Sequence, residues 1–280
     1  MKTGILATGM ALMATFALPA QAEKIEGNGT VITKEIRVDD YSGVSMGGLH
    51  HGGDSFSFTD LFKARTYISP TFNYKQGNES TLRITTDENI LPHLEVKVKE
   101  GVLGIYAEEG ETLLPTKFIV DGMSQKLEAV RISGGGAFYL KSALKGEDLK
   151  IRISGGGDLY MNQPVDVTNC QIRVSGGGNM KGNQISCNQF TIDVSGGGDV
   201  QLGGKAQEGE LRVSGGGDVH AYDMQVEELT FRISGGGSAQ VHALQKLEGH
   251  VSGGGDLYYK GNPNTETSTS GGGDVHKVND

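Results

Sequence analysis

The tetrapeptide Ser-Gly-Gly-Gly occurs eight times from residue 133 onward, at a nearly constant spacing. Successive serines are 21, 21, 20, 19, 20, 18 and 18 residues apart, and they are Ser133, Ser154, Ser175, Ser195, Ser214, Ser234, Ser252 and Ser270. A fixed period of this length is typical of repeat proteins, in which each repeat is one supersecondary unit that packs on the next. The spacing therefore constrains the fold more than any other feature.

Apolar residues keep fixed places relative to each serine. With the serine as position 0, positions −3, −1 and +5 are mostly Ile, Val, Leu, Phe or Met. Odd offsets share one face of a strand, and stacked parallel strands would bury that face in continuous ladders. We therefore predict an all-β fold, a parallel β-helix or β-solenoid with coils of about 20 residues. A β-propeller needs blades of about 40 residues, and leucine-rich repeats need a different leucine pattern.

The glycines at +1 and +3 also have odd offsets. We expect them on the inner face, where the missing side chain lets the opposite wall approach or lets the strand bend. Two charged ladders are expected on the outer face, mainly Arg at −2 and mainly Asp at +4. If the glycines bend the chain, the two ladders can neutralise each other.

Position +6 also faces outward and gives the best surface candidate for a ligand. Aromatic, amide and imidazole groups in a long row suit a glycan or a protein, although Tyr is also common on ordinary strand surfaces. This possible ligand face consists of Tyr139, Tyr160, Lys181, Gln201, His220, Gln240, Tyr258 and His276.

The organisation along the chain has three parts. Residues 1–22 have the pattern of a signal peptide: Lys2, an apolar run, and Ala20-Gln21-Ala22 as the cleavage site. The run is too short to favour a membrane anchor, and no later stretch is apolar enough for a transmembrane span. Residues 23–127 form an irregular β-rich part, with strands expected at 30–38 and 81–85 and a hairpin at 94–107. Residues 128–280 hold the eight repeats, and three threonines make the last coil a polar cap, namely Thr265, Thr267 and Thr269.

The sequence contains only weak matches to known catalytic motifs. Residues 43–47 match the G-x-S-x-G pattern of a nucleophile elbow, but glycine and histidine follow instead of a helix. A phosphate-binding P-loop is not indicated, because no Gly-Lys-Ser/Thr follows a glycine run. The formal net charge of −9 disfavours nucleic acid as a partner. We predict no catalytic residues and no cofactors.

Metal binding is weighed at two places. The GGGD motifs are similar to the calcium-binding β-roll signature, but that signature repeats every nine residues. An aspartate ladder supplies only part of the six to eight oxygens that calcium prefers, and an aspartate that bonds its own turn is the alternative. A second group is His50, His51 and Asp54, which is more typical of a solvated loop.

The chain has two cysteines, Cys170 and Cys187. Cys170 stands at −5, where other repeats carry Leu or Phe, so it is expected in the core. Cys187 is three residues out of register with it. A disulfide is possible in an exported protein, and two buried thiols are the alternative.

Three stretches resemble a known family, the head GIN domain of putative auto-transporter adhesins. They are EIRVDDYSGVSM at 35–46, TLRITTDENILPHLEVKVKEGVLGIYAEEG at 81–110, and the train of SGGGD repeats. A segment at about 47–66, rich in His and Phe, departs from the family and looks like an insertion. The resemblance implies a right-handed β-helix in an exported bacterial envelope protein, located in the periplasm, on the outer-membrane surface or outside the cell. It implies no catalytic residues.

We therefore predict a non-enzymatic protein of the cell envelope or surface, an adhesin or scaffold whose partner is a glycan or a surface protein. One alternative is a polysaccharide-active β-helix enzyme, a lyase or hydrolase, which would need clustered carboxylates or an Arg/Lys base on one coil. The other is a calcium-dependent β-roll.

Overall fold

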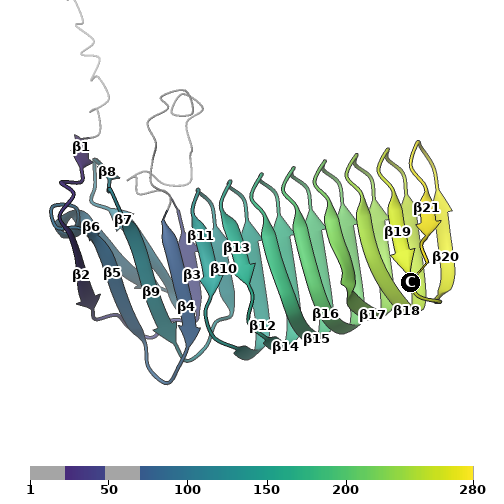
Figure 1. Cartoon of the computed structure of the whole chain (residues 1–280), viewed down its shortest axis with the longest axis horizontal. Helices are drawn as coiled ribbons and strands as arrows, with labels where there is room; N and C mark the ends of the chain where they lie inside the picture. The colour runs from purple at the N-terminus through teal and green to yellow at the C-terminus, as the bar shows by residue number, and fades with distance from the viewer. Residues whose placement is uncertain (1–22, 48–69, 280) are drawn as a thin grey trace, which may run out of the picture.

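The chain forms a row of stacked coils, and the coils follow one another in sequence order from one end of the row to the other (Figure 1). The computed structural model describes residues 23–47 and 70–279. Neighbouring coils are joined by parallel strand pairs whose partners lie about one repeat apart in sequence. The predicted all-β fold, a parallel β-solenoid with coils of about 20 residues, is confirmed.

Each repeat places one strand segment before its glycine turn and another after it. From the fourth repeat on, one long strand often runs from one turn almost to the next. The strands of the repeats are β10 (Ala129–Ile132), β11 (Ala137–Leu140), β12 (Leu144–Ile153), β13 (Asp158–Met161), β14 (Val165–Val174), β15 (Met180–Val194), β16 (Val200–Val213), β17 (Val219–Ile233), β18 (Ala239–Val251), β19 (Leu257–Lys260), β20 (Asn264–Thr269) and β21 (Val275–Lys277).

The register follows the repeat residue by residue. At position −3, Val130 pairs with Ile151 and Ile151 pairs with Ile172. At position +5, Phe138 pairs with Leu159 and the ladder continues to Val275. Most of these apolar side chains are buried and belong to one continuous core cluster. The core is therefore a set of stacked apolar ladders, as the odd offsets predict.

The same sheet continues into the N-terminal part. β3 (Gly43–Met46) pairs in parallel with β10, and β4 (Thr71–Gln76) pairs in parallel with β11. The boundary that the sequence suggests at about residue 128 stays a prediction. The β3–β10 and β4–β11 pairs join the two sides of this boundary.

Antiparallel pairs distinguish this N-terminal part from the repeats. β5 (Thr81–Asp87) lies between β2 (Val31–Ile36) and β9 (Phe118–Ser124), antiparallel to both. The expected hairpin is confirmed: β6 (Leu94–Lys99) pairs antiparallel with β7 (Val102–Ala107). Its turn residues Glu100 and Gly101 have φ of 52° and 74°, the backbone that a two-residue type I′ turn requires.

A separate two-stranded parallel sheet joins β1 (Glu23–Glu26) to β8 (Glu111–Leu114). A short 3-10 helix, η2 (Leu91–His93), lies between β5 and β6. Leu113 is buried and Ile25 packs against the core, so this small sheet is attached to the solenoid by its apolar residues.

Several sequence-based expectations lie outside the described residues. They are the signal peptide at 1–22, most of the insertion at 47–66, and the metal candidate His50, His51 and Asp54. In the parts that are described, no helix has both the length and the apolar character to cross a membrane. At the other end of the solenoid, β20 is exposed at all six positions.

Candidate ligand face

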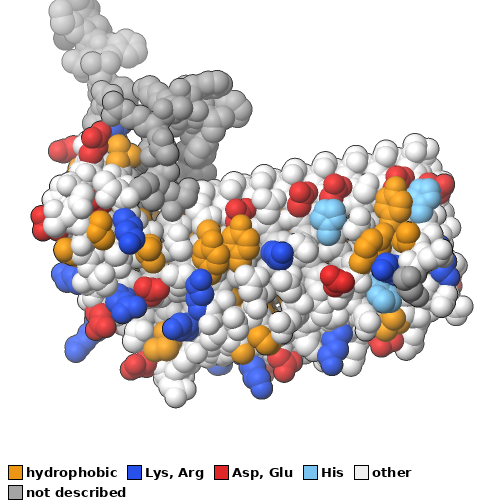
Figure 2. Space-filling view, in the orientation of Figure 1, with side chains coloured by type: hydrophobic (Ala, Val, Ile, Leu, Met, Phe, Trp, Pro, Cys, Tyr) orange, Lys and Arg blue, Asp and Glu red, His pale blue; other side chains and the backbone are white. Residues whose placement is uncertain are grey.

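The residues at +6 form one in-register ladder, which we call the ligand face. Each residue is the strand partner of the corresponding residue in the next coil, from Tyr139 to His276. Their side chains are exposed or half-buried. Figure 2 shows apolar side chains gathered around the position of β11 and β13 and again around that of β19. The repeat thus places all eight candidate residues side by side.

The aromatic rings of the ligand face are stacked at both of its ends. Tyr139 and Tyr160 have ring centroids 5.0 Å apart and planes 14° apart, and Tyr258 and His276 have centroids 5.0 Å apart and planes 23° apart. The ammonium of Lys141 lies 4.4 Å from the Tyr139 ring centroid, a cation–π distance. Each end therefore presents a partly exposed aromatic pair.

The carboxylates at +4 lie beside this row and join successive coils through hydrogen bonds. The backbone N–H of Asp199 donates to the Asn179 side-chain oxygen at 3.0 Å, and the N–H of Asp218 donates to Asp199 Oδ1 at 3.0 Å. The same bond recurs from the first aspartate of the row to the last. The aspartate therefore bonds the following coil rather than its own turn, and Asn179 and Ser238 perform the same task.

Two of these aspartates also accept a hydrogen bond from the ligand face. The Tyr160 hydroxyl donates to Asp158 at 3.3 Å, and the Tyr258 hydroxyl donates to Asp256 at 3.1 Å. The pKa of Tyr160 is raised by partial burial and by the Asp158 charge, and that of Tyr258 by its hydrogen bond to Asp256. These tyrosines therefore stay protonated at neutral pH, and their hydroxyls are held in place.

The glycine turns correct one expectation. A Cβ on Gly176 or Gly178 would overlap the carbonyl oxygen of Gly155 or Gly157 in the preceding coil, whereas a Cβ on Gly177 would meet nothing within 4 Å. The missing side chains therefore admit the neighbouring coil's turn, not an opposite wall. Backbone N–H groups of each turn donate to the turn before it, for example from Gly177 to Gly155 at 3.1 Å.

The expected neutralisation of the Arg and Asp ladders is not seen. Among the described residues no ion pair joins an arginine at −2 to an aspartate at +4; Arg212 pairs with Glu210 instead.

The cysteines are free and buried in the structure. Cys170 occupies the core ladder between Leu149 and Phe190, as its position predicts. Burial raises the pKa of Cys187 to about 11 and that of Cys170 further still. Neither thiol is therefore ionised at neutral pH, and the structure corresponds to the alternative of two buried thiols.

Two small apolar cavities lie in the described part of the chain, and they have volumes of about 10 and 20 Å³, which is near the size of one water molecule. Ser45 of the G-x-S-x-G pattern lies inside strand β3, paired with Arg131 and Gly104. It therefore sits on a regular strand rather than a sharp turn.

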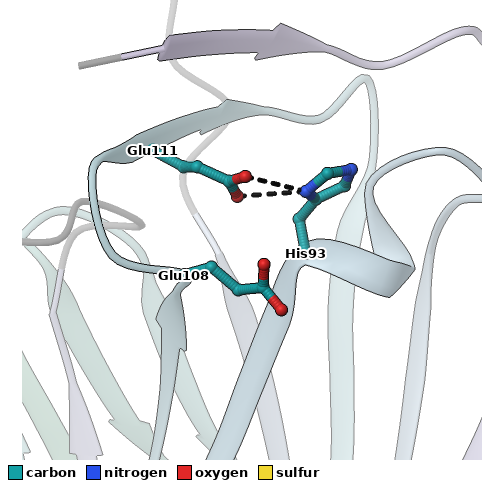
Figure 3. A group of neighbouring side chains, drawn as sticks. All are labelled: His93, Glu108 and Glu111. Carbon is teal, nitrogen blue, oxygen red and sulfur yellow. Dashed lines mark hydrogen bonds and ion pairs between the residues drawn. The ribbon is translucent and has the colours of Figure 1, made fainter. Parts of the chain in front are cut away.

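The structure also brings together three residues that the sequence did not single out: His93, Glu108 and Glu111 (Figure 3). The histidine lies 15 positions before the first glutamate, which is not one of the short ligand spacings typical of zinc motifs. Only the fold of η2 against the β7–β8 turn makes them neighbours.

Comparison with known proteins agrees with this architecture. The family model described as putative auto-transporter adhesin, head GIN domain, matches residues 68–183 and 161–263. No curated protein matches the chain.

Solved structures also match. A putative adhesin from Parabacteroides merdae has 30% identity and a TM-score of 0.82, with 92% of this chain and 100% of that chain covered. A putative adhesin from Parabacteroides distasonis has 30% identity and a TM-score of 0.80, covering 91% and 100%. A structure from the same species described as a putative lipid binding protein has 25% identity and a TM-score of 0.80, also covering 91% and 100%. The chain belongs to the head GIN domain family of putative auto-transporter adhesins.

Proposed function

We propose that this protein is a non-enzymatic, exported attachment protein that binds carbohydrate chains along its ligand face. The observation that carries the proposal is the in-register ladder at +6, with a stacked aromatic pair at each end. The family supports an adhesin in general terms, and the ligand and the face are our inference.

The dimensions of the ladder suit an extended ligand. Seven steps separate Tyr139 from His276, so the row is about 34 Å long at about 4.8 Å per step. A repeating surface of this kind offers similar contacts to a repeating polymer, and several weak contacts add up when one chain spans them.

The chemistry of the ladder suits a sugar. The two rings of each pair cover one face of each other, so the exposed ring edges and the uncovered faces offer apolar contact to sugar C–H groups, while tyrosine hydroxyls provide a polar edge. Gln201 and Gln240 add amide donors and acceptors, and the adjacent Asp199 and Asp218 add acceptors for sugar hydroxyls. The acidic row and the net charge of −9 favour neutral over anionic polysaccharides.

Binding on the outside is also favoured by the small size of the two cavities described above. One structural relative is described as a putative lipid binding protein. Here the cavities of about 10 and 20 Å³ are far smaller than an acyl chain. We therefore place binding on the ligand face rather than in the core.

A non-enzymatic role fits the use of the carboxylates. A glycosidase needs a general acid whose environment raises its pKa, beside a second carboxylate. The carboxylates along this face instead accept backbone N–H groups of the next coil, and none is buried in an apolar pocket.

The test is binding of the mature protein to a panel of neutral and anionic polysaccharides. Replacing both Tyr139 and Tyr160 by Ser should weaken binding about tenfold, because each aromatic contact is worth roughly 0.5–1.5 kcal/mol. Tyr106→Ser is the matched control, since this exposed tyrosine lies on β7, away from the ladder. Equal binding by all variants, or no binding to any polysaccharide, would reject the ligand face.

Two further readouts separate the alternatives. Release of reducing or unsaturated ends would identify a polysaccharide-active enzyme and overturn the non-enzymatic role. A melting temperature that falls on chelation and recovers only with Ca²⁺ would favour the calcium-dependent roll.

A further inference from the structure

We propose that His93, Glu108 and Glu111 form a binding site for a divalent transition metal ion, with Zn²⁺ as the best fit. The site lies at the N-terminal end of the solenoid, apart from the ligand face, and the proposal does not depend on carbohydrate binding.

The three side chains point toward a common place (Figure 3). One ligand atom from each residue lies within 4.8 Å of the other two. His93 Nδ1 is 3.0 and 3.1 Å from the two carboxylate oxygens of Glu111. Ligands about 2.1 Å from a tetrahedral zinc ion are about 3.4 Å from one another. Small side-chain rotations are therefore enough to bring the three atoms to bonding distance.

The backbone holds the three residues together without an ion. The N–H of Glu108 donates to the carbonyl of His93 at 3.1 Å, and the N–H of Glu111 donates to the carbonyl of Glu108 at 3.1 Å. Glu111 is further fixed by the pairing of β8 with β1, and its side chain is only 15% exposed. A preorganised site of this kind loses little entropy when the ion binds.

The charges and donor types select the ion. Two carboxylates beside one imidazole leave a net charge of −2 when the histidine is neutral. Both carboxylate oxygens of Glu111 lie within hydrogen-bond distance of His93 Nδ1. The Glu108 carboxylate makes no hydrogen bond or ion pair with any described residue, so it is available as a ligand. An imidazole nitrogen favours zinc, nickel or copper over magnesium and calcium. Three protein ligands leave the fourth zinc position for water.

A bound ion would connect parts of the chain that are weakly joined. Among the described strands, β8 pairs only with β1, in a sheet separate from the large one. The ion would link β8 and the β7–β8 turn to η2, which lies between two strands of the large sheet. We therefore expect the metal to stabilise the N-terminal end in particular.

The experiment compares metal-free wild-type protein with Glu108→Gln, His93→Gln and the control Glu147→Gln. Glu147 is an exposed glutamate of β12, so its substitution makes the same charge change far from the site. Titration with Zn²⁺ by calorimetry, and with Co²⁺ by visible absorption, measures affinity and coordination. Melting curves with and without Zn²⁺, and hydrogen exchange in β1 and β8, measure stabilisation.

We expect one Zn²⁺ per chain in the wild type and in Glu147→Gln, with a higher melting temperature and slower exchange in β1 and β8. Glu108→Gln should melt at the wild-type temperature without metal, because Glu108 supports no contact, and should lose at least tenfold in zinc affinity. His93→Gln should lose zinc affinity and also melt lower without metal. Unchanged zinc affinity in both variants, no zinc binding, or equally tight Ca²⁺ binding would overturn the proposal.

Discussion

At the scale of single residues, two of the three glycines in a turn are required by the stacking of the coils. From the second turn to the seventh, the first and third glycines lie against carbonyl groups of the preceding turn, and the second faces open space. The aspartate that follows them accepts the N–H of the next coil. The SGGGD motif is therefore mainly a device for stacking turns at strand spacing.

Alanine scanning of one triplet tests this assignment. Gly178→Ala should lower stability by about 1–3 kcal/mol, because its Cβ would force two backbones apart. Gly177→Ala should change stability by less than about 1 kcal/mol, since its Cβ meets no atom. Urea unfolding measures both. Equal losses for the two variants would contradict the stacking account.

The aspartate ladder gives a second prediction. Asp199→Ala leaves the N–H of Asp218 without its acceptor and should cost about 1–2 kcal/mol. Asp199→Asn keeps an oxygen acceptor, as Asn179 already does in the neighbouring coil, and should be nearly neutral. Thermal melting of the two variants separates hydrogen bonding from charge. A loss in Asp199→Asn as large as in Asp199→Ala would show that the charge matters instead.

At the scale of elements, a buried carboxylate holds the N-terminal strands together. Asp87, at the end of β5, accepts N–H groups from Gly29 at 2.8 Å and Thr116 at 2.7 Å, and the Thr116 hydroxyl at 2.6 Å. It thus joins the segment before β2 to the segment before β9. Burial alone raises the pKa of Asp87, but these donors outweigh it and hold the pKa below its usual value.

This lowered pKa predicts a pH dependence. The folded state favours the ionised carboxylate, so its contribution is present above about pH 4, the unfolded pKa, and is lost as pH falls through the lower folded pKa. Asp87→Asn places an amide NH₂ or a single acceptor where two oxygens accept, and should cost about 1–3 kcal/mol at pH 7. The difference from wild type should shrink below pH 4. A difference that is constant from pH 7 to pH 3 would contradict this role.

At the scale of the whole molecule, the C-terminal end of the solenoid differs from its middle coils in burial and polarity. The middle coils each have a neighbour on both sides. Among the described strands β20 pairs only with β18, and it is exposed and polar throughout. A terminal coil with apolar residues in these places would offer a continuing ladder to another molecule.

This reasoning predicts the effect of an apolar cap. Replacing Thr265, Thr267 and Thr269 together by Ile extends the Leu247 and Val251 ladders to the free end. The variant should self-associate at lower concentration than the wild type, as measured by analytical ultracentrifugation. Thr230→Ile, on an exposed outer position of β17, serves as the control for added hydrophobicity. An identical association state for all three proteins would contradict a capping role.

The sequence by itself determined the coil length, the register and the identity of the core. These follow from spacing and parity, because stacked parallel strands place equivalent residues of successive repeats on top of each other, as in the ladder from Val130 to Ile172. The residues of the ligand face could be predicted for the same reason.

The tertiary structure alone decided those contacts that the sequence repeat does not predict. The +4 carboxylates bond the next coil's N–H groups, and the glycines make room for the preceding turn, because the exact stacking distance and hydrogen-bond directions set those partners. The antiparallel strands, the Asp87 contacts, and the meeting of His93 with Glu108 and Glu111 lie in the N-terminal part, where no repeat fixes the register. There the packing of distant segments, rather than local pattern, decides which side chains become neighbours.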